Sequence, residues 1–157
     1  MPTDDDLRFD DGEATPQRLR GQLSRLLGLT AAQTHRVAGD ALGAVGAHKD
    51  HFISLAALDE FGPLSQAKLS SHTRIYTSDL VAVLARLEQD GYVSRAPDPA
   101  DKRRNVVTIT DRGRTRLTEL DGILAVVNER ILAPLEQAER AQLFDLLRRI
   151  GGSAARA

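Results

Sequence analysis

The sequence contains no cysteine and no tryptophan, and only 4% of its 157 residues are aromatic. Without cysteine the chain forms no disulfide, no thiolate metal site and no thiol redox switch. With so few aromatic residues, the core must consist mostly of leucine, valine, isoleucine and alanine. The hydrophobic content of 41% is sufficient for a core of this aliphatic kind.

Long apolar runs and catalytic motifs are also missing. No stretch approaches the roughly 20 apolar residues of a membrane span, and the acidic N-terminus does not resemble a signal peptide. The patterns of zinc peptidases, serine hydrolases and P-loop proteins do not occur. We therefore expect a cytoplasmic protein that is not an enzyme and needs no cofactor. His48 and His51 lie beside Asp50, so a metal site is conceivable, but polar residues at a helix start are the simpler interpretation.

Charge is distributed unevenly along the chain, although the net charge is only −1. Residues 1–13 hold six acidic side chains and one basic side chain, whereas residues 64–117 hold ten basic and six acidic ones. The total therefore conceals a basic body beside an acidic segment. We expect residues 1–14 to form a disordered acidic tail.

Helical signals dominate residues 15–62. A first helix is expected from Thr15 to about Gly28, with proline at its first helical position. A capping box at Thr30 predicts the start of a second helix, which continues to Val45, and a third covers residues 49–60. These segments are expected to form dimerisation and linking helices.

The pattern changes within residues 63–110. Ser65 is placed to cap a short helix, and Thr77 or Ser78 to cap a longer one that ends before Gly91. Residues 92–95 and 106–110 are rich in β-branched residues and predict two strands, joined by a projecting loop with two prolines. The order of helix, turn, helix, strand, basic loop and strand predicts a mainly α fold with a small β-hairpin wing.

Two further helices are expected in residues 111–157, separated by Pro134. The first is capped by Thr110 and carries apolar residues at steps of three and four, which is typical of a helix that packs on a partner. These residues are Leu117, Leu120, Leu124, Val127 and Ile131. We expect this seam to build a homodimer, with ordinary core packing as the alternative.

This arrangement suits double-stranded DNA. A helix fits the major groove, and a loop with arginine reaches the minor groove or the phosphates. The candidate DNA-binding residues are Ser65, Gln66, Thr77, Ser78, Asp79, Val81, Ala82, Arg86, Arg95, Lys102, Arg103 and Arg104. Arg86 suits either a phosphate or a pair with Asp90, and Asp79 either accepts from a base or caps its helix. Asp101 is expected to pair with Arg103, with an unpaired surface acid as the alternative.

The sequence resembles the MarR (multiple antibiotic resistance regulator) family of winged helix-turn-helix regulators. The likeness is carried by residues 62–69, by residues 78–81 with 87–93, and most specifically by the wing, residues 98–110, with its Asp-x-Arg element at Asp101 and Arg103. The resemblance implies homodimers, palindromic operators and often a small-molecule effector bound between the dimerisation helices and the DNA-binding lobe. Here the outward face of the second helix lacks arginine, asparagine and glutamine up to Ala85, which predicts modest base readout.

The expected function is therefore that of a transcription regulator, and of a repressor released by its effector. His35, His51 and Phe52 are the residues expected nearest the effector, since two can form hydrogen bonds and one can stack. A winged-helix module that binds protein instead of DNA is the alternative, and the arginine-rich wing argues against it.

Overall fold

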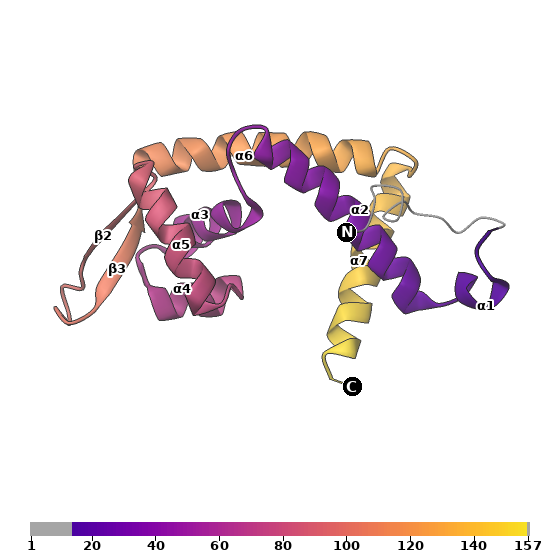
Figure 1. Cartoon of the computed structure of the whole chain (residues 1–157), viewed down its shortest axis with the longest axis horizontal. Helices are drawn as coiled ribbons and strands as arrows, with labels where there is room; N and C mark the ends of the chain where they lie inside the picture. The colour runs from indigo at the N-terminus through magenta and orange to yellow at the C-terminus, as the bar shows by residue number, and fades with distance from the viewer. Residues whose placement is uncertain (1–13, 157) are drawn as a thin grey trace. The chain divides into compact units, whose positions relative to one another are not determined.

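The computed structural model describes residues 14–156, so the acidic tail expected for residues 1–14 lies almost wholly outside the described part (Figure 1). The chain forms two compact units, divided between Leu124 and Ala125. The first unit holds helices α1 to α5, a three-stranded sheet and the first part of α6. The second unit holds the rest of α6 and α7.

Helices α1 (Gln17–Arg20) and α2 (Leu23–Gly43) begin the first unit. The sequence predicted a break near Gly28 and a new helix capped by Thr30, and this prediction is wrong. The Thr30 hydroxyl donates to the Leu26 carbonyl, 2.7 Å away, from within α2. A threonine whose hydroxyl bonds the carbonyl four residues earlier lies inside a helix and does not start one. The capping-box pattern at Thr30 was therefore fortuitous.

Two histidines, His48 at the N-cap and His51 in the first turn, form a capping box at the start of helix α3 (Lys49–Phe61). Nδ1 of His48 accepts from the Asp50 backbone N–H at 3.3 Å, and Nδ1 of His51 accepts from the His48 backbone N–H at 3.2 Å. This reciprocal arrangement satisfies two of the backbone donors that a helix N-terminus leaves unpaired. The histidine pair therefore has a structural role as a cap, and no group of metal ligands occurs within residues 14–156.

Helices α4 (Gln66–Thr73) and α5 (Thr77–Gln89) form the helix-turn-helix. As predicted, Ser65 caps α4, because its hydroxyl accepts from the Lys68 N–H at 3.3 Å. Gly91 follows α5 with a φ of +76°, as expected for the residue that ends a helix in the left-handed conformation. The turn between the helices places Arg74 in the same left-handed region, with a φ of 58°.

The sheet has the antiparallel order β1-β3-β2. Strands β2 (Val93–Pro97) and β3 (Asn105–Ile109) form the predicted hairpin, which extends away from the helices in Figure 1. The two-residue strand β1 (Leu64–Ser65) was not predicted, because two residues carry no period-two pattern. It pairs with β3 and thereby fastens the start of α4 to the base of the hairpin.

The core of the first unit is aliphatic, as the composition required. Its fully buried side chains are almost all leucine, with Leu55, Leu69, Leu80 and Leu84 each completely inaccessible. These residues come from α3, α4 and α5, so the helix-turn-helix is packed on α3 as one body. A rigid support of this kind holds the exposed face of α5 in a defined position.

Helix α6 (Asp111–Ile131) begins against the sheet. The Thr110 hydroxyl accepts from the Gly113 N–H at 3.0 Å, which confirms the predicted cap. Leu117 and Leu120 are buried in the core of their own chain. The expectation that these two residues face a second chain is therefore wrong, because the aliphatic lobe needs them to complete its own interior.

The second unit contains the last turns of α6 and helix α7 (Gln137–Ala154). Arg140 joins the two helices, because its guanidinium donates to Glu129 at 2.8 Å and to the Leu135 carbonyl at 3.0 Å. Helix α7 has no buried residue, and Phe144, Leu146, Leu147 and Ile150 are all exposed. Of the helices within residues 14–156, none is long and apolar enough to cross a membrane.

Candidate nucleic-acid interface

Helix α5 is sharply divided into a buried face and an exposed face. Leu80, Val83, Leu84 and Leu87 are buried, while the residues between them face solvent. The exposed side chains near the start of the helix are Thr77, Ser78, Asp79, Val81 and Ala82, all of which were predicted to meet DNA. A packed helix with a small, mildly polar exposed face has the shape that fits a major groove.

The start of α5 differs from the prediction in one respect. Neither Thr77 nor Ser78 caps the helix, because both lie in its first turn. The N-cap residue is Tyr76, whose side chain forms no capping hydrogen bond. The Tyr76 side chain is 79% exposed. The hydroxyl groups of the first turn are therefore not needed to complete the helix, and Thr77 bonds only weakly to Ser70, at 3.4 Å.

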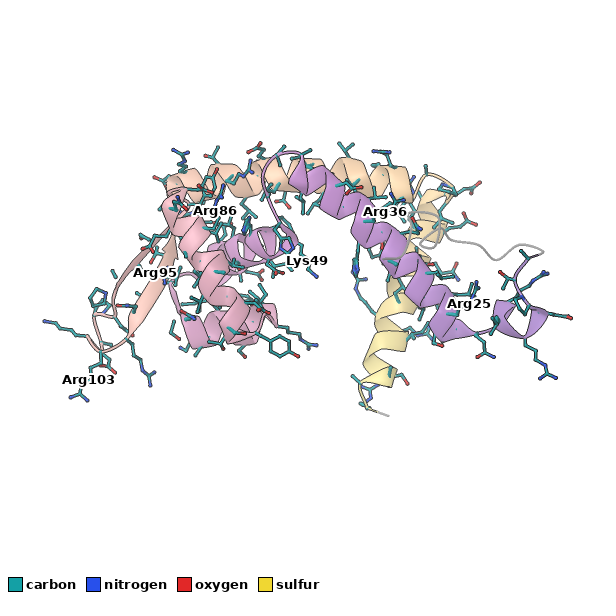
Figure 2. All side chains as sticks on the ribbon, viewed as in Figure 1. Arg25, Arg36, Lys49, Arg86, Arg95 and Arg103 are labelled. Carbon is teal, nitrogen blue, oxygen red and sulfur yellow. The ribbon has the colours of Figure 1, made fainter. Side chains whose placement is uncertain are left out.

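The wing tip is an ordered loop. Asp98 N–H donates to the Arg104 carbonyl at 2.7 Å, and the Arg104 N–H donates to the Asp101 carbonyl at 2.9 Å. The Asp98 carboxylate also accepts from the Ala100 N–H at 2.9 Å. These bonds hold the loop in shape and leave the side chains of Lys102 and Arg103 exposed; Figure 2 shows Arg103 at the far end of the hairpin. Less conformational entropy is then lost when these cations meet DNA.

The expected pair between Asp101 and the Arg103 side chain is not formed. The Asp101 carboxylate accepts from the backbone N–H of Arg103 at 3.1 Å, and its charged partner is Arg104, at 3.8 Å. The acid therefore shapes the turn, and within residues 14–156 the Arg103 guanidinium has no carboxylate partner. The cause is the local turn, which directs the Arg103 side chain outward.

Other arginines of the lobe are held by neighbouring groups. Arg86 pairs with Asp90 at 2.8 Å, and Arg95 pairs with Glu88 at 3.0 Å, which ties β2 to α5. The hydrogen bond to Asp90 and the negative charge of that carboxylate raise the pKa of Arg86 above its ordinary value, so it stays charged. Both arginines are accessible enough for a phosphate to compete with the carboxylates.

A cavity of about 240 Å³ lies where the hairpin meets α4. Lys68 and Arg104 line it together with Ser65, Pro63 and Asp98. Lys68 has no carboxylate partner in the described part of the chain. The start of α4 thus contributes a cation to the same surface as the wing.

Comparison with known proteins identifies this architecture. The model of the MarR family matches residues 50–104, which include α3, the helix-turn-helix and most of the wing. The transcriptional repressor NicR of Pseudomonas putida is 30% identical over 99 residues, which is 63% of each chain. Residues 50–104 therefore form a MarR-type winged helix-turn-helix lobe. The match to NicR spans less than two thirds of that repressor's length.

Solved structures of MarR-family proteins share the fold. BpsR of Bordetella bronchiseptica superposes with a TM-score of 0.76 at 24% identity, over 87% of this chain and 98% of BpsR. The DNA binding of BpsR is regulated by 6-hydroxynicotinic acid. A MarR variant of E. coli in complex with operator DNA superposes with a TM-score of 0.72 at 22% identity, over 82% of this chain and 92% of that one. The mainly helical fold with a β wing is therefore that of MarR regulators, which are not enzymes.

The three residues that the sequence placed near an effector differ in their surroundings. His35 is exposed on α2, His51 is half-buried with its Nδ1 engaged in the α3 cap, and Phe52 packs against the core. The cavity found beside α3 is lined by other residues, including Lys49 and Arg74. The placement of an effector beside His35, His51 and Phe52 stays a prediction.

Sequence reasoning did not single out Lys68, Arg74 or Tyr76. Lys68 comes one turn after the predicted cap Ser65, so helical spacing could have placed it on the end of α4 that was expected to face DNA. Arg74 and Tyr76 lie in the turn before α5, for which the sequence predicted only a connection. The residue type could have indicated that Tyr76 is exposed, because a large aromatic residue in a short polar turn cannot easily be buried in the core.

Proposed function

We propose that this chain is a repressor that binds a palindromic double-stranded operator as a homodimer. Residues 63–110 form the DNA-binding lobe, flanked by helical regions at 15–62 and 111–157 that dimerise and link. The observation that carries the proposal is the combination, on one lobe, of an exposed helix face on α5 and a hydrogen-bonded wing with Arg103 exposed at its tip. The helix enters the major groove, and the wing reaches the adjacent minor groove.

The proposed DNA contacts have different strengths. Lys102, Arg103 and Arg104 supply the salt-dependent attraction to phosphates, with Ser65 and Gln66 at the start of α4 beside them. Thr77, Ser78 and Asp79 offer hydrogen bonds to bases, and Val81 and Ala82 offer contacts to thymine methyl groups. Arg86 and Arg95 are partly neutralised by Asp90 and Glu88, so their contribution is smaller.

Dimerisation is proposed from the exposed apolar residues that each unit carries. In the first unit they are Leu19, Leu23 and Leu27 of α1 and α2, and in the second unit Phe144, Leu146, Leu147 and Ile150 of α7. A single chain that exposes this many large apolar side chains on consecutive helical turns gains by burying them against a second copy. A dimer then presents two α5 helices to half-sites roughly 34–36 Å apart.

Regulation by a small molecule is part of the proposal. BpsR, which shares the fold, responds to a small heteroaromatic acid, and NicR is a repressor. A ligand that binds the DNA-free arrangement more tightly shifts the protein away from its operator by that difference in affinity. Since the operator lies on the chromosome, a cytoplasmic location follows from the proposed function.

A mobility-shift titration on the DNA upstream of the chain's own gene tests the function. The wild-type chain should bind this DNA, and Arg103→Ala should weaken binding and lower the magnitude of the salt slope by about two per dimer, one for each wing. Arg36→Gln, which removes an exposed cation on α2, is the matched control and should leave the slope unchanged. No shift at any salt concentration would refute the proposal and favour a winged-helix module that binds protein.

A further inference from the structure

The turn between α4 and α5 carries two residues that its local geometry does not favour. Arg74 has a φ of 58°, and within residues 14–156 it is the one residue other than glycine with a positive φ. Tyr76 is the N-cap residue of α5, but its side chain forms no capping hydrogen bond. Glycine or asparagine is preferred at the first of these positions, and serine, threonine, aspartate or asparagine at the second. Each residue therefore makes the fold less stable than a common alternative would.

Ile75, which lies between these two residues, anchors the turn. Its side chain is buried in the core of the lobe. Its N–H donates to the Thr73 hydroxyl at 3.3 Å, and its carbonyl accepts from the Ser70 hydroxyl at 2.6 Å. Because Ile75 is held inward, the side chains of Arg74 and Tyr76 on either side face solvent, and Tyr76 is 79% exposed. An ordered turn therefore presents both side chains at the surface.

Neither side chain is used inside the part of the chain that the structure describes. There, Arg74 forms no ion pair, and the Tyr76 ring makes no aromatic or cation–π contact. Exposed residues that break a local rule without helping the fold are expected at functional sites. Arg74 and Tyr76 line one depression together with Asp79 of the first turn of α5. They therefore belong to the same surface as the helix face that is proposed to read bases.

The chemistry of the two side chains fits DNA beside the base that Asp79 is proposed to contact. Since Tyr76 and Asp79 line the same depression, they would meet neighbouring base pairs. The aromatic ring offers an apolar surface, and the apolar group that DNA presents in the major groove is the C5-methyl group of thymine. The Arg74 guanidinium offers charge-assisted hydrogen bonds, which suit the oxygens of a backbone phosphate.

We propose that Tyr76 is a specificity-determining residue that contacts the methyl group of one thymine in each half-site, and that Arg74 binds the DNA backbone beside it. The inference rests on the proposed function, because it requires a chain that binds its operator through α5. Base readout then extends from the short side chains of α5 to a large side chain that precedes the helix. The turn is less stable than it could be because its two exposed side chains contact DNA.

Replacement of thymine by uracil in the operator tests the Tyr76 contact, because it removes the C5-methyl group without changing base pairing. At one thymine of each half-site, uracil should weaken binding of the wild-type protein about fourfold, as expected for one methyl group that is no longer buried. In Tyr76→Ser the same replacement should have no effect. At thymines that meet Val81 or Ala82, uracil should weaken binding of both proteins alike. Equal sensitivity of the two proteins at every thymine would overturn the assignment.

Two variants separate contact with DNA from a structural role. Tyr76→Ser supplies a helix cap, and Arg74→Gly supplies the residue that adopts a positive φ most easily, so both should raise the urea midpoint of unfolding. Both should nevertheless weaken operator binding by roughly tenfold. Arg74→Gly should also lower the magnitude of the salt slope by about two per dimer, whereas Tyr76→Ser should leave the slope unchanged. Tyr76→Phe keeps the ring and should retain most of the affinity.

Phe61→Ser is the matched control, because it removes another exposed aromatic ring from the same lobe. It should leave operator affinity and the uracil effect as they are in the wild type. If the wild type binds its operator and both turn variants bind equally well, the roles given to Tyr76 and Arg74 are wrong and the proposed function stands. If affinity falls only together with the urea midpoint, the turn is structural and the inference is wrong. If the wild type does not bind the DNA at all, the proposed function fails, and this inference fails with it.

Discussion

At the scale of single residues, Gly113 stands out among the glycines of residues 14–156, because it has no room for a side chain. It is buried at the start of α6, and a Cβ placed there would clash with the Tyr92 carbonyl oxygen and lie 2.8 Å from Cγ1 of Ile109. The Tyr92 carbonyl lies just before β2 and is held by the Thr110 N–H, and Ile109 is a core side chain, so neither can move without loss of stability. The close approach of α6 to the sheet, and with it the position of the wing, depends on glycine here.

Gly113→Ala should therefore lower the free energy of unfolding by about 1–3 kcal/mol, although alanine favours helices over glycine. Gly122→Ala is the matched control on the same helix, because no atom lies within 4 Å of its added Cβ. That variant should raise the free energy of unfolding by about 0.5–1 kcal/mol. Urea unfolding of both variants measures the difference, and equal effects would contradict the close approach.

The half-buried His51 should make stability depend on pH. Burial, followed by the proximity of His48 and of Arg86, lowers the pKa of His51 below its ordinary value of 6.5, and the opposing effect of Asp50 and Asp90 is smaller. The neutral ring also accepts a cap hydrogen bond at Nδ1, which a proton would abolish. As pH falls below about 6.5, the unfolded chain takes up a proton before the folded chain does, so the free energy of unfolding decreases.

Replacement of His51 by glutamine should remove this part of the pH dependence. Glutamine keeps an acceptor at the third position of the helix and does not titrate. Urea unfolding between pH 7.5 and pH 5 should show a smaller loss of stability in His51→Gln than in the wild-type chain, while the exposed-site variant His35→Gln follows the wild type. A pH profile that His51→Gln leaves unaltered would show that another group is responsible.

At the scale of elements, the proposed base specificity rests on the exposed face of α5. Its exposed residues are short, and Asp79 is the charged residue of the first turn, where a carboxylate is favoured by the helix dipole. The Asp79 side chain accepts no hydrogen bond from the described residues, and the capping position is Tyr76. Capping is therefore not the role of Asp79, which leaves the carboxylate free to accept from a cytosine amine.

Asp79→Ala should change the base preference at one position of each half-site, by about 1–3 kcal/mol between the best and the next base. Binding of the wild type and the variant to a set of singly substituted operators measures this preference. Asp79→Asn, which replaces the acceptor by an amide, should prefer a different base at the same position. A uniform loss across all operators that follows a loss of stability would assign Asp79 to the helix alone.

At the scale of the whole molecule, the apolar surface of α7 points to a second chain. The helix buries no residue in its own chain, and Leu147 and Ile150 are 42% and 39% exposed. Light scattering at micromolar concentration should report twice the chain mass of 17.1 kDa. Leu147→Glu with Ile150→Glu should shift the mass toward that of one chain, because burying two carboxylates at an interface is costly.

Val81→Glu is the matched control for this change. Val81 is 50% exposed and lies on α5, so a charge there should leave the dimer intact. A wild-type protein that is monomeric at micromolar concentration would contradict the dimer. A control that dissociates as readily as the α7 variant would show that the interface lies elsewhere.

The sequence by itself determined the order of most helices and of the hairpin strands, because the signals that start and end these elements are local. The Ser65 and Thr110 caps, the glycine after α5 and the two β-branched strands were all predicted and are present. The same local chemistry misled at Thr30, where a capping pattern lies inside a continuous helix. A hydroxyl near a backbone carbonyl or amide has two uses, and only the surrounding turns decide between them.

Only the tertiary structure decided which side chains are free. Their spacing placed Leu117 and Leu120 on one face of α6, but it did not show what that face contacts. Both side chains pack into the core of the lobe. Composition placed three cations in the wing, but the turn at Asp101 selects Arg104 as its partner and leaves Arg103 outward. Lys49 and Arg74 line one cavity beside α3, although they are 25 positions apart in the sequence. No local pattern predicts this proximity, because it results from the packing of α3 on the helix-turn-helix.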